Sequence, residues 1–245
     1  MTKRIRVIGI GAGHPDQVTV EAIEALRSVD WFITADKGGD DPLLAAREAL
    51  LARHLQVVPP VVAVRDPERD RDPADYDRAV ADWHDARAEA YEAAMLSHDG
   101  DVGLLVWGDP AFYDSTIRIV EKVLARGNVD ADWDVIPGIS SLQMLAARHR
   151  IVLHDVGRPI LVTTGRRLRE ALAAGAENIL VMLSSTVDLD GFDGWHIWWG
   201  ANLGTADERL VSGPVLEVAV EVLTTRIEVK TKVGWIMDVY LLRKP

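Results

Sequence analysis

The hydrophobic pattern predicts strands that alternate with helices through roughly the first 150 residues. The apolar run at 103–106 has no polar alternation, which is typical of a strand buried on both faces of a parallel sheet. It ends at once in a turn, 108–110, built from Gly, Asp and Pro. Apolar runs at 5–10 and 133–136 also end at glycines before a predicted helix. This alternation predicts an α/β fold with a mainly parallel N-terminal sheet.

The second half of the chain has a different pattern. Its last apolar run is followed by no helix before residue 245, so the C-terminal sheet is predicted to be mixed. We place the boundary near 152, giving an N-terminal α/β domain at 1–152 and a C-terminal α/β domain at 153–245. Further strands are predicted in both halves, at 31–34, 55–58, 160–163, 179–183, 195–199, 208–211 and 233–242.

Composition restricts the class of protein. The chain has 245 residues, of which 48% are hydrophobic and 27% charged, as in an ordinary globular protein. No apolar run approaches the roughly 20 residues that span a bilayer, so no membrane partner is expected. A net charge of −11 argues against nucleic acid as a partner. The sequence contains no cysteine, which excludes disulfides and thiolate metal sites and fits a cytoplasmic location. The histidines are scattered, so no metal site is predicted.

Glycine turns mark a predicted ligand site. The strands that end at Gly9, Gly108 and Gly138 would place these turns at one edge of the sheet, where open α/β folds bind ligands. A dinucleotide-binding loop is the alternative, but the position expected to be its last glycine is His14. Asp36 lies about 20 residues further on, where an acid that binds ribose would sit. A non-catalytic nucleotide-binding module therefore stays open as an alternative.

Three segments in this order resemble the tetrapyrrole methylases: 9–19, 108–113 and 136–141. The resemblance covers nearly the whole chain. It implies two α/β domains with the active site in the trough between them, and a homodimer. It also implies S-adenosyl-L-methionine (SAM) as methyl donor, S-adenosyl-L-homocysteine as its product, and a small-molecule tetrapyrrole as substrate.

The same resemblance assigns the cofactor contacts by position, and most of them would be made by main-chain groups. Ala12 stands where many relatives have proline and Leu203 where others have alanine, and main-chain contacts survive both changes. The cofactor-binding residues implied are Ala12, Gly108, Asp109, Pro110, Tyr113, Ser140, Ser141, Met182 and Leu203.

Further stretches resemble a branch of the family that also releases an acetyl group from its substrate. Methyl transfer needs alignment of the reacting atoms and exclusion of water rather than acid–base chemistry. Acetyl release is different, because water must add to a carbonyl and a base would help. Asp36, Asp109 and Tyr113 are the catalytic candidates, although the methylated macrocycle could also expel the group without a dedicated base. Methylation at another ring carbon, or of uroporphyrinogen III, is the alternative within the family.

The substrate of this family carries several carboxylates, while the chain itself is strongly acidic. The binding region must therefore be locally basic. The residues expected to form that basic rim are Lys37, Arg148, Arg150, Arg166 and Arg167.

Overall fold

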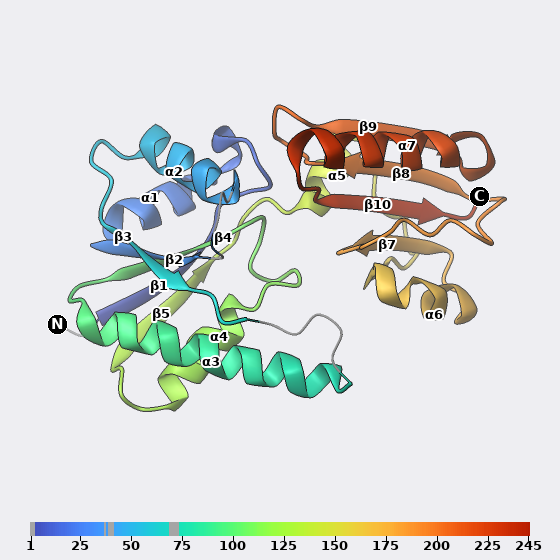
Figure 1. Ribbon diagram of the computed structural model, residues 1–245. Coiled ribbons are helices and arrows are strands. Elements are labelled where there is room, and N and C mark those ends of the chain that lie inside the picture. Colours follow the sequence, from blue (N-terminus) through green and yellow to red (C-terminus); the bar gives the residue numbers. More distant parts are fainter. Residues whose placement is uncertain (1–2, 37, 39–41, 69–73) are drawn as a thin grey trace. The chain divides into compact units, whose positions relative to one another are not determined.

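The computed structural model describes residues 3–36, 38, 42–68 and 74–245, and these form two compact units (Figure 1). The first unit comprises the chain up to Gly11 and Pro15–Ile139. The second comprises Ala12–His14 and Ser140–Pro245. The contacts thus separate the units at Ile139, while the division into folding domains near residue 152 stays a prediction.

The first unit is built on a five-stranded sheet in which all pairings are parallel. Its order is β3-β2-β4-β1-β5, so the strands that carry the three glycine turns are neighbours at β4-β1-β5. The parallel sheet predicted from the apolar runs is confirmed. The strands are β1 (Lys3–Gly9), β2 (Trp31–Asp36), β3 (Val61–Arg65), β4 (Val102–Val106) and β5 (Ala131–Ile136).

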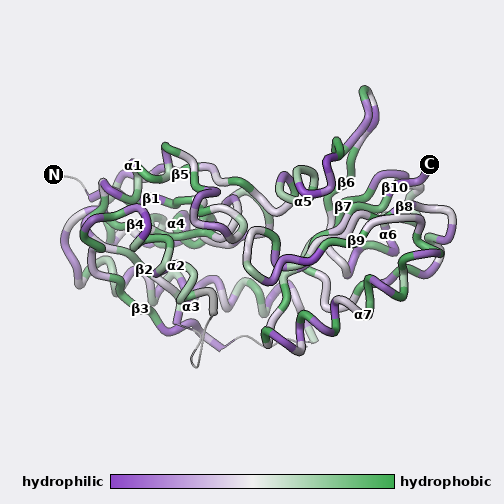
Figure 2. Tube along the Cα trace, turned by 90° about the horizontal axis from the view of Figure 1, so that it is seen from above, coloured by the Kyte–Doolittle hydropathy of each residue, from purple (hydrophilic) through white to green (hydrophobic). Residues whose placement is uncertain are grey.

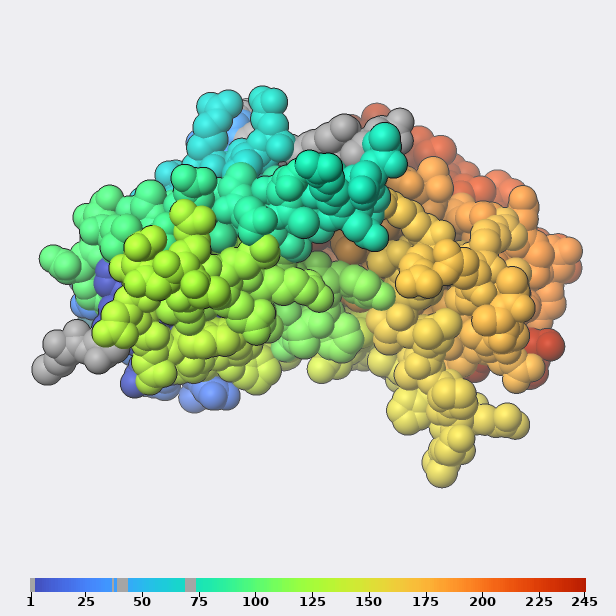
Figure 3. Space-filling model, turned by 90° about the horizontal axis from the view of Figure 1, so that it is seen from below, coloured from blue at the N-terminus to red at the C-terminus, as the bar shows by residue number. Residues whose placement is uncertain are grey.

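Helices cover both faces of this sheet. On β1, Ile5 and Val7 belong to the core cluster that includes α3 and α4, whereas Ile8 belongs to the cluster that includes α1 and α2. Helices α3 and α4 lie side by side on their face (Figures 1 and 3). This two-sided burial explains why the central strand β4 lacks polar alternation. The helices are α1 (Val20–Ser28), α2 (Pro42–His54), α3 (Tyr76–Ser97) and α4 (Thr116–Ala125).

The strand predicted at 55–58 is wrong, because the third strand is β3, at Val61–Arg65. Leu55 still donates its backbone N–H to Leu51 at 2.9 Å, so it completes the turn of α2. Val57 is 83% exposed and lies in the loop that follows. The loop ends at Pro60, which has no N–H to donate, so pairing with β2 starts from its carbonyl.

The second unit contains a mixed five-stranded sheet of order β6-β7-β10-β8-β9. Only β6 and β7 pair in parallel, and the other pairs are antiparallel, which confirms the prediction of a mixed sheet. The strands are β6 (Leu161–Thr164), β7 (Asn178–Met182), β8 (His196–Ala201), β9 (Arg209–Pro214) and β10 (Asp238–Arg243). The helices are α5 (Ser141–His149), α6 (Leu168–Ala173) and α7 (Val215–Val233).

Helix α7 was not predicted. The strand expected at 233–242 is shorter in the structure, because the helix occupies its first residue and a loop follows. The helix ends at Val233 with Gly234 in the left-handed conformation (φ 82°), and β10 begins only at Asp238. Its buried residues recur at seven-residue intervals, at Val215, Val222 and Val229. Hydrophobic and polar positions alternate along α7 in Figure 2. This mixture of β-branched and charged residues hides the helical period in the sequence.

In the part of the chain that the structure describes, no helix is long and apolar enough to cross a membrane.

Candidate active site

The three glycine turns of the first unit pack directly against one another. A Cβ at Gly138 would lie 2.1 Å from the carbonyl oxygen of Gly108, and a Cβ at Gly9 would lie 2.6 Å from the nitrogen of Gly138. Real Cβ atoms do not approach backbone atoms this closely. Only glycine therefore allows the ends of β1, β4 and β5 to bring their main chains together.

A short backbone bridge also joins the first two turns. Gly108 donates its N–H to the carbonyl of Gly11 at 2.8 Å, and Gly11 donates to Gly108 at 3.3 Å. Both residues have positive φ, 80° for Gly11 and 71° for Gly108, which glycine adopts without strain. The turns after β1 and β4 thus meet through their main chains, which suits a ligand bound through main-chain groups.

Asp109 is held by the main chain through both of its carboxylate oxygens. Oδ2 accepts the N–H of Gly138 at 2.9 Å, and Oδ1 accepts the N–H of Ala111 at 2.8 Å. The carboxylate therefore ties the turn after β4 to the turn after β5. This geometry describes a residue that fixes the turns, and the role of Asp109 as a base stays a prediction.

The other catalytic candidates lie at the same edge of the sheet or just beyond it. Asp36 ends β2, beside β4, is exposed, and accepts the N–H of Gly38 at 2.8 Å. Tyr113 follows the turn after β4, is 46% exposed, and has a left-handed backbone with φ 54°. Pro110 lies in that turn, and its side chain lies 3.0 Å from the position of a Cβ on Gly9. Lys37 lies outside the described residues.

In the second unit, the predicted site residues gather at one edge of the mixed sheet. Strands β6, β7 and β8 all run in the same direction, with β10 opposed to them, so their carboxyl ends share an edge. Arg166 and Arg167 follow β6, Met182 ends β7, and Leu203 comes two residues after β8. The structure brings these segments to the edge where α/β folds bind ligands.

The segment Ala12–His14 packs with the turn after β8. A Cβ at Gly13 would lie 2.6 Å from the carbonyl oxygen of Leu203 and 2.9 Å from Cγ2 of Thr205. Ala12 and Leu203 are 5% and 3% exposed, so their side chains are packed and any ligand contact would use their main chains. The resemblance assigns both residues to the cofactor site, and the fold brings their segments together although they are far apart in the sequence.

Ser140 precedes the first residue of α5, and it is buried. The side chain of Gln143 accepts its backbone N–H at 2.7 Å, in the arrangement of a capping box. Ser141 is the first residue of the helix and is half-buried. Ser140 thus stands at the start of the helix that the sequence predicts after the strand ending at Gly138.

The four described arginines of the predicted rim are exposed but differ in their partners. Arg148 donates from Nε to both carboxylate oxygens of Glu208, at 2.8 and 3.0 Å, so its charge is largely balanced. Arg167 pairs with Glu170 at 2.8 Å, and both side chains are well exposed. Arg150 ends α5 in the left-handed conformation, with φ 56°. Solvent screens the exposed pair, so Arg167 keeps more of its charge for an anionic ligand than Arg148 does.

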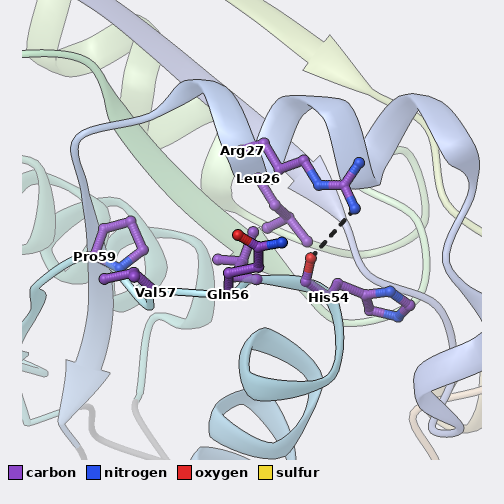
Figure 4. A pocket seen from close by; sticks show the side chains of 7 residues that line it. Leu26, Arg27, His54, Gln56, Val57 and Pro59 are labelled. Carbon is purple, nitrogen blue, oxygen red and sulfur yellow. Dashed lines mark hydrogen bonds between the residues drawn. The ribbon is translucent and has the colours of Figure 1, made fainter.

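A separate cavity of about 360 Å³ lies in the first unit, away from the glycine turns (Figure 4). It is lined by the end of α1 and by the loop that leads into β3, and Arg27 donates to the carbonyl of His54 at 3.5 Å across it. These segments precede β2 and β3, so the cavity lies at the amino edge of the sheet, opposite the turns. We therefore do not assign it to the site.

No group of three or more histidine, aspartate or glutamate side chains in the described residues is arranged to hold a metal ion. His149 instead lies with Nε2 3.0 Å from the carbonyl oxygen of Trp199, and burial lowers the pKa of its imidazole.

The sequence reasoning missed the buried ion pair between Arg226 of α7 and Asp238 of β10. Charged residues usually belong to a solvated face, so Arg226 and Asp238 gave no reason to expect burial. Because helix α7 was not predicted either, nothing in the sequence pattern indicated that the two residues meet.

A model of the family described as tetrapyrrole (corrin/porphyrin) methylases matches residues 4–219. The chain belongs to this family. It is 45% identical to precorrin-6A synthase [deacetylating] of Sinorhizobium sp., over 99% of this chain and 95% of that protein. It is also similar to the crystal structure of the cobalamin synthesis related protein CobF from Corynebacterium diphtheriae, with 37% identity, a TM-score of 0.86, and coverage of 100% and 99% of the two chains.

A more distant structure shares the fold alone. It is the uroporphyrin-III C-methyltransferase of Thermus thermophilus complexed with S-adenyl homocysteine, with 17% identity and a TM-score of 0.59 over 98% of this chain and 97% of that one. The family resemblance and the two-sheet α/β fold expected from the sequence are both confirmed.

Proposed function

We propose that this enzyme transfers a methyl group from SAM to C-1 of precorrin-5 and releases the C-20 acetyl group as acetate, which gives precorrin-6A in cobalamin biosynthesis. The observation that carries the choice of reaction is the 45% identity with precorrin-6A synthase, which extends over 99% of the chain. The fold alone would not choose the substrate, because a relative with 17% identity that acts on another tetrapyrrole shares it.

The residues at the strand ends fit SAM as the ligand. In the first unit the main chains after β1, β4 and β5 pack so closely that a Cβ at Gly9 or Gly138 would meet neighbouring backbone, and we infer that the main-chain groups of these turns form the cradle for SAM. In the second unit, Gly13 allows the same close approach beside Leu203. Backbone N–H and C=O groups at such positions can bind a nucleoside and an amino acid without charged side chains. The residues that would contact SAM are Ala12, Gly108, Asp109, Pro110, Tyr113, Ser140, Ser141, Met182 and Leu203.

SAM supplies an electrophilic methyl group when it is bound. The protein's part is to fix the ligand on a rigid edge and to exclude water, since alignment carries most of the rate in such a transfer. The turns are suited to this because Asp109 and the bridge between Gly11 and Gly108 hold them together. For acetyl release, Asp36, Asp109 and Tyr113 are the candidates to assist the attack of water, unless the methylated macrocycle expels the group without a base. Each carboxylate oxygen of Asp109 accepts one main-chain N–H, so Asp109 would act as a base while it also holds the turns.

Binding and turnover test this function in sequence. Titration calorimetry of the protein with SAM and with S-adenosyl-L-homocysteine should show micromolar binding of both, with no binding of NAD. Incubation with precorrin-5 and methyl-labelled SAM should then place the label at C-1 and release one acetate for each methyl group transferred.

Each alternative gives a distinct result in these assays. Label at another ring carbon, or transfer without acetate, would assign the protein to a different methylation step of the same family. NAD binding without SAM binding would favour the nucleotide-binding module and would overturn the methyltransferase proposal.

If the arginines of the basic rim bind the tetrapyrrole, their loss should change the KM for the tetrapyrrole but leave the Kd for SAM unchanged. Reversal of charge at both Arg166 and Arg167 (R166E/R167E) should raise the KM for the tetrapyrrole at least about tenfold, because the carboxylates of the substrate would meet two acids. The Kd for SAM should stay unchanged within about twofold, since SAM is proposed to bind mainly through the main chain. Steady-state kinetics and calorimetry measure the two constants.

The matched control reverses the same number of charges at the opposite edge of the second sheet. Arg158 precedes β6, and Lys244 follows β10 and pairs with Glu177 at 3.5 Å. The variant R158E/K244E should keep both constants. An unchanged KM in R166E/R167E would remove these two arginines from the rim.

The proposal also includes a homodimer in the cytoplasm. An exposed apolar stripe on α7 supports self-association, because it runs along the helix at spacings of three and four residues. The stripe consists of Leu216, Val220, Leu223 and Ile227, which are between 41% and 77% exposed. The lack of cysteine supports the cytoplasmic location.

A further inference from the structure

We propose that the ion pair between Arg226 and Asp238 is a positioning pair that holds two turns of the second unit in the backbone conformation that binds SAM. The first is the β7 turn, residues 182–184, and the second is the β8 turn, residues 201–203. The inference rests on the proposed function only in that SAM is the ligand.

The pair is buried and well formed. Nε of Arg226 donates to Oδ2 of Asp238 at 2.8 Å, and the two side chains are 12% and 2% exposed. Nε1 of Trp199 donates to the same oxygen at 3.1 Å. Burial raises the pKa of the nearby Tyr240 to about 12, so its hydroxyl stays protonated and neutral. The guanidinium therefore provides the charge that balances Asp238.

Arg226 also reaches the β7 turn directly. Its Nη2 donates to the carbonyl oxygen of Ser184 at 3.0 Å. The preceding residue, Leu183, has a left-handed backbone with φ 52° and is 63% exposed. This conformation is disfavoured for leucine, and its exposed side chain gains no burial that would offset the strain. Gly165 also packs closely against Ser184, because a Cβ on Gly165 would lie 2.5 Å from Oγ of Ser184.

Asp238 reaches the β8 turn through the start of β10. It pairs in register with Ala201, the last residue of β8. The residue before it, Met237, exchanges two hydrogen bonds with Asn202: Asn202 donates its N–H to the carbonyl of Met237 at 2.8 Å, and Oδ1 of Asn202 accepts the N–H of Met237 at 2.9 Å. Asn202 also has a left-handed backbone, with φ 48°, and it leads into Leu203.

Both turns contain a non-glycine residue with positive φ, which an ion pair that only stabilised the fold would not require. Of the four non-glycine residues with positive φ in the described chain, two are Leu183 and Asn202, each directly after a strand of this edge. Strained backbone of this kind persists only where the surroundings fix it, and it gathers where ligands bind. One ion pair contacts or adjoins both turns. We therefore assign it to the geometry of the cofactor site.

The variant Arg226→Lys tests the assignment, because lysine keeps the positive charge beside Asp238 but lacks the fork that also reaches Ser184. We expect the Kd for SAM to rise about tenfold in calorimetry, with kcat at saturating SAM unchanged within about twofold. In the ligand-free protein, the amide NMR signals of Leu183 and Ser184 should shift. Wild-type protein that binds no SAM would refute the proposed function, whereas the NMR result would still report on the turns.

Arg6→Lys is the matched control, because the fork of Arg6 also joins two partners, Asp134 and Ser28, and all three residues belong to the first unit, whereas the two turns belong to the second. It should leave the Kd for SAM unchanged. Should Arg226→Lys fail to fold, the double variant Arg226→Met/Asp238→Leu replaces the pair by apolar side chains, which buried pairs often tolerate. An unchanged Kd for SAM in either folded variant, or unfolding of both, would overturn the assignment, since the pair would then serve the fold alone.

Discussion

Replacement of Gly138 by alanine is expected to raise the Kd for SAM more than about a hundredfold and to destabilise the protein by about 3 kcal/mol. The added Cβ would lie 2.1 Å from the carbonyl oxygen of Gly108 and 2.9 Å from two backbone atoms of Gly9. No side-chain rotation relieves a contact with backbone, so the turns after β1, β4 and β5 must move apart. Calorimetry with SAM and thermal unfolding measure the two effects.

Gly194 provides the control for this substitution. A Cβ there meets nothing within 4 Å, its φ is not positive, and the residue is exposed. Gly194→Ala should therefore keep both the unfolding temperature and the affinity for SAM. If Gly138→Ala bound SAM as well as the wild type does, the glycine turns would not form the cofactor cradle.

The centre of the first sheet could be predicted because β2, β4 and the second half of β1 are buried on both faces. Continuous apolar runs such as 103–106 are informative without any knowledge of their partners. The errors occur where tertiary contacts decide the structure. At 55–58 an apolar run continues the end of a helix, and the prolines that follow delay the strand. Helix α7 escaped because β-branched and charged residues alternate along it.

The part of the site that could be predicted is the set of glycine turns, because glycine itself indicates a turn or a close backbone approach. Gly9, Gly108 and Gly138 end three strands, and the shared edge follows from parallel pairing alone. The sequence could not show which groups each carboxylate would meet. Asp109 and Gly138 are 29 residues apart, and Arg226 reaches Ser184 across 42 residues. Such contacts depend on the assembled fold, so the sequence named Asp109 as a cofactor contact and as a possible base, but not as the residue that ties two turns together, and it did not name Arg226.

The substitution Asp109→Asn separates the two roles considered for this residue. An asparagine has one carbonyl oxygen and one NH₂ group, so it can accept only one of the N–H groups of Gly138 and Ala111 and presents donors to the other. We expect a loss of about 1 kcal/mol in the free energy of unfolding, since one charge-assisted bond to the main chain, partly buried at Gly138 or exposed at Ala111, is lost. The Kd for SAM should rise more than about tenfold, because the turns after β4 and β5 are no longer tied together.

Asp75 is the matched control, since its carboxylate accepts a single backbone N–H, that of Arg78, at 3.0 Å as the cap of α3. Asparagine caps helices as well as aspartate does, so Asp75→Asn should behave as the wild type. A general base would give the opposite pattern at Asp109. Normal affinity for SAM with loss of acetate release would return Asp109 to catalysis, whereas weakened SAM binding with acetate and methyl transfer reduced in proportion would establish it as the residue that fixes the turns.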